Sequence, residues 1–129
     1  MPILFNKVER VNPTDKTAPK RWFPVLRTIT RTTEKQVAKE IADETTLNPK
    51  EAEMALSQFE KVLIRNLLAS NSVQLGDWGT FHLTCNGTGA DTKEGVTAAS
   101  INKLNIRFVP GKGINSALAG ATFIPAENL

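Results

Sequence analysis

The chain has 129 residues, which suits one compact domain, and its 40% hydrophobic content predicts a core that needs neither disulfides nor metal. A single cysteine excludes an intramolecular disulfide, and the absence of a secretion signal or long apolar run predicts a cytoplasmic protein. The net charge of +3 is compatible with an anionic partner without proving one. The positive charge is concentrated near the N-terminus, because residues 1–40 carry nine Lys or Arg against four Asp or Glu.

The N-terminal region predicts a pair of strands. Apolar residues recur along residues 3–11, and Asn12-Pro13 ends this first strand-like pattern. After a polar loop at residues 14–20, the stretch 22–29 is rich in β-branched and aromatic residues. Pro24 confines this second strand to a sheet edge or to an irregular start.

Two amphipathic helices follow. Thr33 and Gln36 have the spacing of a capping box, and the apolar stripe after them predicts a helix over about residues 33–44. Asn48 caps a longer helix, in which Pro49 occupies the first turn, where its missing N–H does no harm. The apolar stripe of this longer helix consists of Ala52, Ala55, Leu56, Phe59, Val62, Leu63 and Leu67. A face this broad is expected to pack against a partner subunit, although an ordinary core helix shows the same pattern.

Strand alternation then replaces the helical period. Residues 73–75 alternate, a turn follows at residues 76–79, and the next strand places Phe81, Leu83 and Cys85 on one face. After a long connection, a further strand is expected to point Asn102, Leu104, Ile106 and Phe108 inward and Lys103, Asn105 and Arg107 outward. The outward row is polar and cationic, which suits a strand that faces nucleic acid.

Two motifs, together with the order of these elements, resemble the HU/IHF family of bacterial histone-like DNA-binding proteins. Trp78-Gly79-Thr80-Phe81, preceded by Val73-x-Leu75, is similar to the family's Gly-Phe-Gly-Thr-Phe turn. Asp77 stands for the first Gly of that turn and Trp78 for its first Phe. Phe108-Val109-Pro110-Gly111-Lys112 is similar to the family's entry into its last helix.

The resemblance covers about residues 32–119. It implies an N-terminal extension with β-strands over residues 1–31, an HU-like DNA-binding domain over residues 32–119 and a C-terminal tail over residues 120–129. The implied fold is α+β: two N-terminal helices, an antiparallel β-sheet with a protruding β-ribbon arm, and a short C-terminal helix. The family's assembly is an intertwined dimer, so a homodimer is expected.

The resemblance also implies a function and a set of contacts. Double-stranded DNA would be the partner, bound without a cofactor by phosphate and minor-groove contacts of low sequence specificity. The expected DNA-binding residues are Lys93, Lys103, Asn105, Arg107 and Lys112, with Arg27 and Arg31 from the basic N-terminal segment. The protein is therefore expected to be a nucleoid-associated architectural protein and not an enzyme.

Some residues depart from the family pattern. Residues 82–109 contain no proline, so the wedge that kinks DNA in strongly bending members is missing from the arm. The expected arm tip at residues 91–95 is acidic on balance, and Val109 replaces a usually basic residue. Because these departures predict weaker contact with DNA, a dimeric structural or protein-interaction module with the same fold is an alternative function. A helix-turn-helix regulator using the two helices is a further alternative.

Catalytic and metal-binding interpretations find little support. His82 and Cys85 are three apart on a strand and face opposite sides, so they cannot form a nucleophile–base pair. One histidine and one cysteine are too few for a typical zinc site. Gly111-Lys112-Gly113 lacks the remaining residues of a phosphate-binding loop. We expect His82 to face solvent, Cys85 to be a small buried hydrophobe, and the protein to use no metal, membrane or small-molecule substrate.

Overall fold

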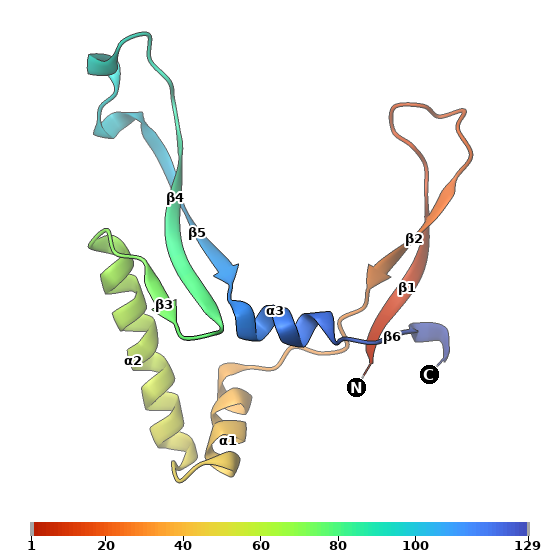
Figure 1. Ribbon diagram of the computed structural model, residues 1–129, viewed down its shortest axis with the longest axis horizontal. Coiled ribbons are helices and arrows are strands. Elements are labelled where there is room, and N and C mark those ends of the chain that lie inside the picture. Colours follow the sequence, from red (N-terminus) through yellow and green to blue (C-terminus); the bar gives the residue numbers. More distant parts are fainter. Residues whose placement is uncertain (1, 129) are drawn as a thin grey trace. The chain divides into compact units, whose positions relative to one another are not determined.

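The chain folds as two compact units in the computed structural model, which describes residues 2–128 (Figure 1). One unit combines the N-terminal segment up to Thr32 with the C-terminal segment from Ala117, and the other comprises Thr33–Ser116. The composition predicts one compact domain instead. A strand near the C-terminus pairs with the first strand of the chain, which brings both ends of the sequence into the first unit. The division at residues 31 and 119 into domains stays a prediction.

The first unit contains a three-stranded sheet of order β2-β1-β6. Its strands are β1 (Ile3–Arg10), β2 (Arg21–Leu26) and β6 (Phe123–Pro125). β1 pairs antiparallel with β2 on one side and parallel with β6 on the other. Pro24 lies on β2, which is an outer strand, so its missing N–H costs the sheet no internal hydrogen bond. A 3-10 turn at Ala126–Asn128 follows β6.

The second unit begins with two helices, α1 (Glu34–Glu44) and α2 (Pro49–Leu68). Both predicted caps are present. The Gln36 N–H donates to the Thr33 hydroxyl oxygen at 3.4 Å, and the Gln36 side-chain oxygen accepts from the Thr33 N–H at 2.8 Å. Asn48 and Glu51 form the equivalent box at α2. These boxes satisfy N–H groups that the first turn of each helix leaves without a partner.

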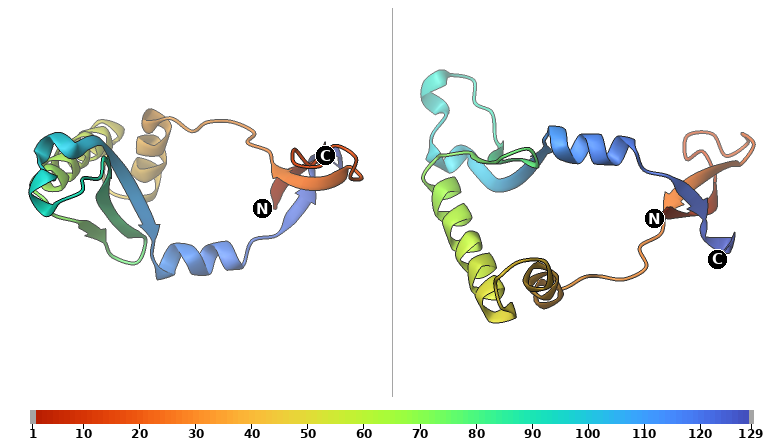
Figure 2. Two further views of the ribbon diagram at one scale, coloured as in Figure 1. Left: turned by 90° about the horizontal axis from the view of Figure 1, so that it is seen from above. Right: turned by 60° about the horizontal axis from the view of Figure 1, so that its bottom comes forward.

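A three-stranded antiparallel sheet of order β3-β4-β5 follows the helices. Its strands are β3 (Val73–Leu75), β4 (Gly79–Gly87) and β5 (Ile101–Pro110). β3 pairs only with the start of β4, so the remainder of β4 and β5 continues as a two-stranded arm (Figure 2). Two 3-10 turns, Lys93–Gly95 and Ala98–Ser100, lie at the arm tip. β5 leads into α3 (Lys112–Ala119).

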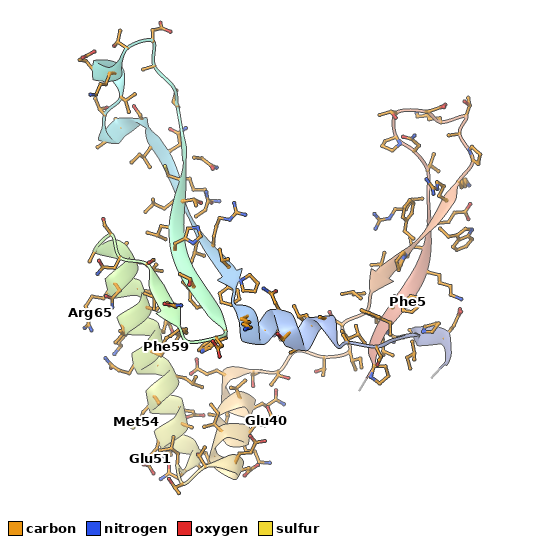
Figure 3. All side chains as sticks on the ribbon, in the orientation of Figure 1. Phe5, Glu40, Glu51, Met54, Phe59 and Arg65 are labelled. Atoms are coloured by element: carbon orange, nitrogen blue, oxygen red, sulfur yellow. The ribbon has the colours of Figure 1, made fainter. Side chains whose placement is uncertain are left out.

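Few hydrophobic residues are buried within the described chain. They are Leu4, Ala38, Ala52, Leu67 and Ala126, of which three are alanines. The predicted stripe of α2 is only partly enclosed. Phe59, which Figure 3 labels on α2, packs against Trp78 with ring centroids 6.3 Å apart, whereas Ala55 is exposed. Many of the larger apolar side chains of residues 2–128 are therefore only partly enclosed by the chain itself.

Candidate nucleic-acid interface

The arm carries a continuous polar face. The register places His82 opposite Arg107, Thr84 opposite Asn105 and Asn86 opposite Lys103. Directly opposite residues share a face of an antiparallel pair, because side chains alternate along both strands. The Asn105 side-chain N–H donates to Asn86 Oδ1 at 3.2 Å, which links the two rows. This surface, the polar arm face, combines two cations, a histidine and three neutral hydrogen-bonding side chains without an acid.

The two cations of the polar arm face are available to an external anion. Lys103 and Arg107 are exposed, and within residues 2–128 neither forms an ion pair with a carboxylate. Four residues of strand separate their Cα atoms by about 13 Å. That spacing corresponds to about four base-pair steps along a duplex. Two phosphates on one groove edge are therefore within reach of one arm.

The opposite side of the arm is apolar. Phe81 and Phe108 pack with ring centroids 4.9 Å apart, and Leu83 lies opposite Ile106. The prediction that the hydrophobic residues of β5 point away from its polar row is confirmed by this register. The prediction that they are buried is wrong, because Leu104 is 52% exposed and Ile106 58% exposed. We call this surface the apolar arm face.

Asn102 and Cys85 also differ from their predicted environments. A register shift next to Gly87 leaves Asn102 outside the regular pairing, and its exposed side chain donates to the Thr88 hydroxyl oxygen at 3.0 Å. Asn102 therefore does not point into a core. Cys85 is exposed and not buried, because no second layer covers the apolar arm face. His82, expected to face solvent, is half-buried beside Arg107.

The arm tip contributes little positive charge. Lys93 lies in the first 3-10 turn, and the connecting residues 88–100 also contain Asp91 and Glu94. The Thr92 hydroxyl oxygen accepts from the Gly95 N–H at 3.2 Å, which shapes the turn. Lys93 is thus separate from the polar arm face and lies in a locally acidic segment.

The start of α3 is joined to the β3–β4 turn. The Gly111 N–H donates to the Trp78 carbonyl at 2.9 Å, and the Gly113 N–H donates to the Asp77 carbonyl at 2.8 Å. Lys112 lies between these two donors and is exposed. The two motifs that carried the family resemblance therefore meet at one junction.

Arg27 and Arg31 belong to the other unit. Arg27 follows β2, and its N–H donates to the Leu4 carbonyl at 2.9 Å. Arg31 lies in the exposed segment that leads to α1. Of the seven predicted DNA-binding residues, the structure brings Lys103, Asn105 and Arg107 onto one face. The sequence did not predict that Asn86 shares this face, because its position there depends on the strand register.

A metal site and a membrane-spanning helix find no support in the described part of the chain. Residues 2–128 contain no cluster of three His, Cys, Asp or Glu side chains that could hold a metal ion. None of the helices described there combines the length and hydrophobicity needed to cross a bilayer. The polar arm face is thus the candidate site with the clearest chemistry.

Sequence comparison identifies the family. A family model described as "HU domain fused to wHTH, Ig, or Glycine-rich motif" (HU-HIG) matches residues 1–125. The chain belongs to the HU-HIG family. This confirms the resemblance to HU proteins, and the match also includes residues 1–31, which the resemblance in the sequence did not cover. No curated protein matches the sequence.

A solved structure shares the fold. The crystal structure of a protein described as a putative bacterial DNA-binding protein from Bacteroides vulgatus matches with a TM-score of 0.69 at 14% sequence identity. The match covers 96% of this HU-HIG chain and 47% of that protein, so the chain spans about half of its length. The likeness supports the α+β HU-like fold, and at this identity it shows fold alone.

Proposed function

We propose that this HU-HIG protein is an architectural, histone-like DNA-binding protein. It would bind double-stranded DNA with low sequence specificity, mainly through phosphate and minor-groove contacts made by a homodimer. The observation that carries the proposal is the acid-free polar arm face with Lys103 and Arg107 exposed on it. Membership in an HU-domain family and the likeness to a protein described as DNA-binding support it. Such a protein would be associated with the nucleoid.

Low sequence specificity follows from the types of side chain on the polar arm face. Cations and amides on a two-stranded arm reach phosphates and sugars, and such contacts position a duplex without reading its sequence. The arm has no proline between residues 82 and 109 to wedge between base pairs. We therefore expect DNA to be held with little intercalative kinking.

The proposed homodimer rests on exposed apolar surface. α2 exposes Met54 by 71% and Leu68 by 69% (Figure 3 labels Met54), and the apolar arm face exposes Leu104 and Ile106 by more than half. The alternating row of exposed apolar residues on β5 is a surface of the kind that protein interfaces cover. A second copy would cover the same patches on both chains through a two-fold axis. Each dimer would then present two arms.

Charge reversal tests the DNA-binding proposal. Lys103→Glu combined with Arg107→Glu should abolish binding of a fluorescent 30-base-pair duplex, measured by anisotropy from 50 to 200 mM salt. For the wild type, log affinity should fall steeply with log salt, because each neutralised phosphate releases about 0.9 counterion. A flat plot for the wild type would refute phosphate-based binding.

A matched control separates local from global charge effects. Lys35→Glu with Lys39→Glu makes the same change in net charge on α1, also at a spacing of four residues. This variant should retain most of the duplex affinity if the polar arm face makes the contact. An equal loss in both variants would mean that net charge, and not the arm, attracts DNA.

A dimeric structural or protein-interaction module is the second candidate. The acidic balance of residues 88–100, where Asp91 and Glu94 outweigh Lys93, favours it over strong DNA binding by the tip. Under this alternative, reversal of Lys103 and Arg107 would leave partner binding intact, and the wild type would not shift duplex DNA even at low salt.

A further inference from the structure

The loop between β1 and β2 holds its shape through its own side chains. Asn12 Oδ1 accepts from the Thr14 N–H at 3.0 Å and from its hydroxyl at 2.7 Å. Asp15 Oδ1 accepts from the Thr17 N–H at 3.0 Å and from its hydroxyl at 2.6 Å. Asp15 is the only acidic residue in loop positions 11–20, and its carboxylate is engaged within the loop. The loop is therefore ordered and leaves its cations without a local acidic partner.

A hollow of about 660 Å³ lies beside this loop, at the end of the β1–β2 hairpin. Its lining includes Arg10, Arg21, Val11, Pro13, Pro19 and Phe23. The lining carries two positive charges, no negative charge and a largely hydrophobic wall. Its volume falls within the range of roughly 300–1,000 Å³ that is usual for small-ligand sites. A ligand that fits it combines an anionic group with an apolar surface.

The strand register places the two arginines side by side. Arg10 and Arg21 are the last residue pair of the β1–β2 ladder, and residues directly opposite in such a ladder have Cβ atoms about 5 Å apart. Like charges at this spacing repel, and neither guanidinium forms an ion pair within residues 2–128. An anion bound between them would remove that repulsion and accept hydrogen bonds from both.

Phe23 supplies the flat part of the site. It lies two residues after Arg21 and so on the same face of β2, and its side chain is 41% exposed. Trp22, the neighbouring aromatic residue, lies on the opposite face and does not line the hollow. An exposed aromatic ring beside two arginines matches the way proteins bind unpaired nucleotides, by stacking on the base and pairing with the phosphate.

We infer that this hollow binds an unpaired nucleotide of a DNA strand, with the phosphodiester at Arg10 and Arg21 and the base against Phe23. A bare phosphate would leave the apolar wall uncovered, and a base inside an intact duplex has no free face to offer. The inference rests on the proposed function and extends it, because it predicts a preference for DNA that contains unpaired positions.

Binding of single-stranded and gapped DNA by the full chain tests the inference. Fluorescent ten-residue oligothymidylate, an intact 30-base-pair duplex and the same duplex with a three-nucleotide gap serve as probes in anisotropy titrations. The wild type should prefer the gapped over the intact duplex. Phe23→Ala should weaken oligothymidylate binding by about tenfold, the order expected for one lost base–aromatic contact, and should remove the gap preference.

Variants that remove positive charge from the hollow test the inference independently. Arg10→Gln and Arg21→Gln should each weaken oligothymidylate binding and lower its salt slope by about 0.7, as expected for one lost phosphate contact on a single strand. Trp22→Ala is the aromatic control, and Lys16→Gln is the loop-cation control outside the lining. Both controls should bind oligothymidylate like the wild type. Circular dichroism confirms that each variant is folded, and Phe23→Leu replaces Phe23→Ala if the latter unfolds.

The outcomes separate this inference from the proposed function. Equal wild-type affinity for gapped and intact duplexes, or unchanged oligothymidylate binding in folded Phe23 and arginine variants, overturns the inference. A ten-residue polyglutamate peptide that competes as well as unlabelled oligothymidylate also overturns it, because the hollow would then accept acidic protein segments. If the wild type binds oligothymidylate but not the intact duplex, the proposed duplex function fails while the nucleotide site stands.

Discussion

The Gly111 N–H donates a hydrogen bond to the Trp78 carbonyl at 2.9 Å, which ties the end of β5 to the β3–β4 turn. A Cβ atom on Gly111 would lie 2.5 Å from the Asp77 carbonyl oxygen, so the close approach requires glycine. Gly111→Ala should therefore lower the free energy of unfolding by about 2 kcal/mol, because backbone must move to relieve the overlap. Urea unfolding followed by circular dichroism measures this loss.

Gly89→Ala is the matched control for that prediction. A Cβ atom on Gly89 meets no atom within 4 Å, so its substitution should change the free energy of unfolding by less than about 0.5 kcal/mol. Similar losses at both positions would show that the junction of the two motifs has no special packing requirement.

Local sequence rules predicted the elements of this protein well. The caps at Thr33 and Asn48 depend on side chains within three residues, and the structure contains both. The break at Asn12-Pro13 likewise depends on local backbone chemistry, and β1 ends close to it, at Arg10. Such signals need no knowledge of the remaining chain.

Long-range relationships could not be predicted in the same way. The pairing of β6 with β1 joins residues near opposite ends of the sequence and has no local signal. The exposure of Cys85 and Leu104 depends on whether a second layer covers their face, which alternation alone does not reveal. The meeting of Arg10 with Arg21 required the register of the hairpin.

The end of α2 contains a residue in a left-handed conformation. Ser70 has φ +69°, and the Asn71 N–H donates to the Asn66 carbonyl at 3.0 Å, which completes a Schellman motif. Because this backbone region disfavours residues with a Cβ atom, Ser70→Gly should raise the free energy of unfolding by about 0.5–1 kcal/mol. Chemical denaturation at equilibrium measures the gain.

Ser57→Gly supplies a control of opposite sign. Ser57 is exposed in the interior of α2, where glycine costs about 0.5 kcal/mol or more relative to other residues. Stabilisation at residue 57, or destabilisation at residue 70, would contradict the assignment of the positive φ as the cause.

The hydrogen bonds of Asp15 predict a pH effect in the β1–β2 loop. The hydroxyl of Thr17, followed by its N–H, holds the pKa of the Asp15 carboxyl below its ordinary value of 3.8. A depressed folded-state pKa contributes stability that is present at neutral pH and is lost as the pH falls through that pKa. Thr17→Ala should raise the Asp15 pKa toward 3.8 in a carbon-detected NMR titration. Thr14→Ala removes a hydroxyl that bonds Asn12 instead, and it should leave the Asp15 pKa unchanged.

Self-association should depend on the apolar arm face. Ile106 is 58% exposed on that face, and Asn105, its neighbour on β5, lies on the polar arm face. Placing a carboxylate in an apolar interface leaves a charge without a partner, so Ile106→Asp should weaken dimerisation by at least about tenfold. Sedimentation velocity over a concentration series measures the effect.

Asn105→Asp introduces the same carboxylate one residue away and should leave the dimer intact, because that residue lies outside the proposed interface. A monomeric wild type, or equal sedimentation of both variants with the wild type, would remove the apolar arm face from the dimer interface.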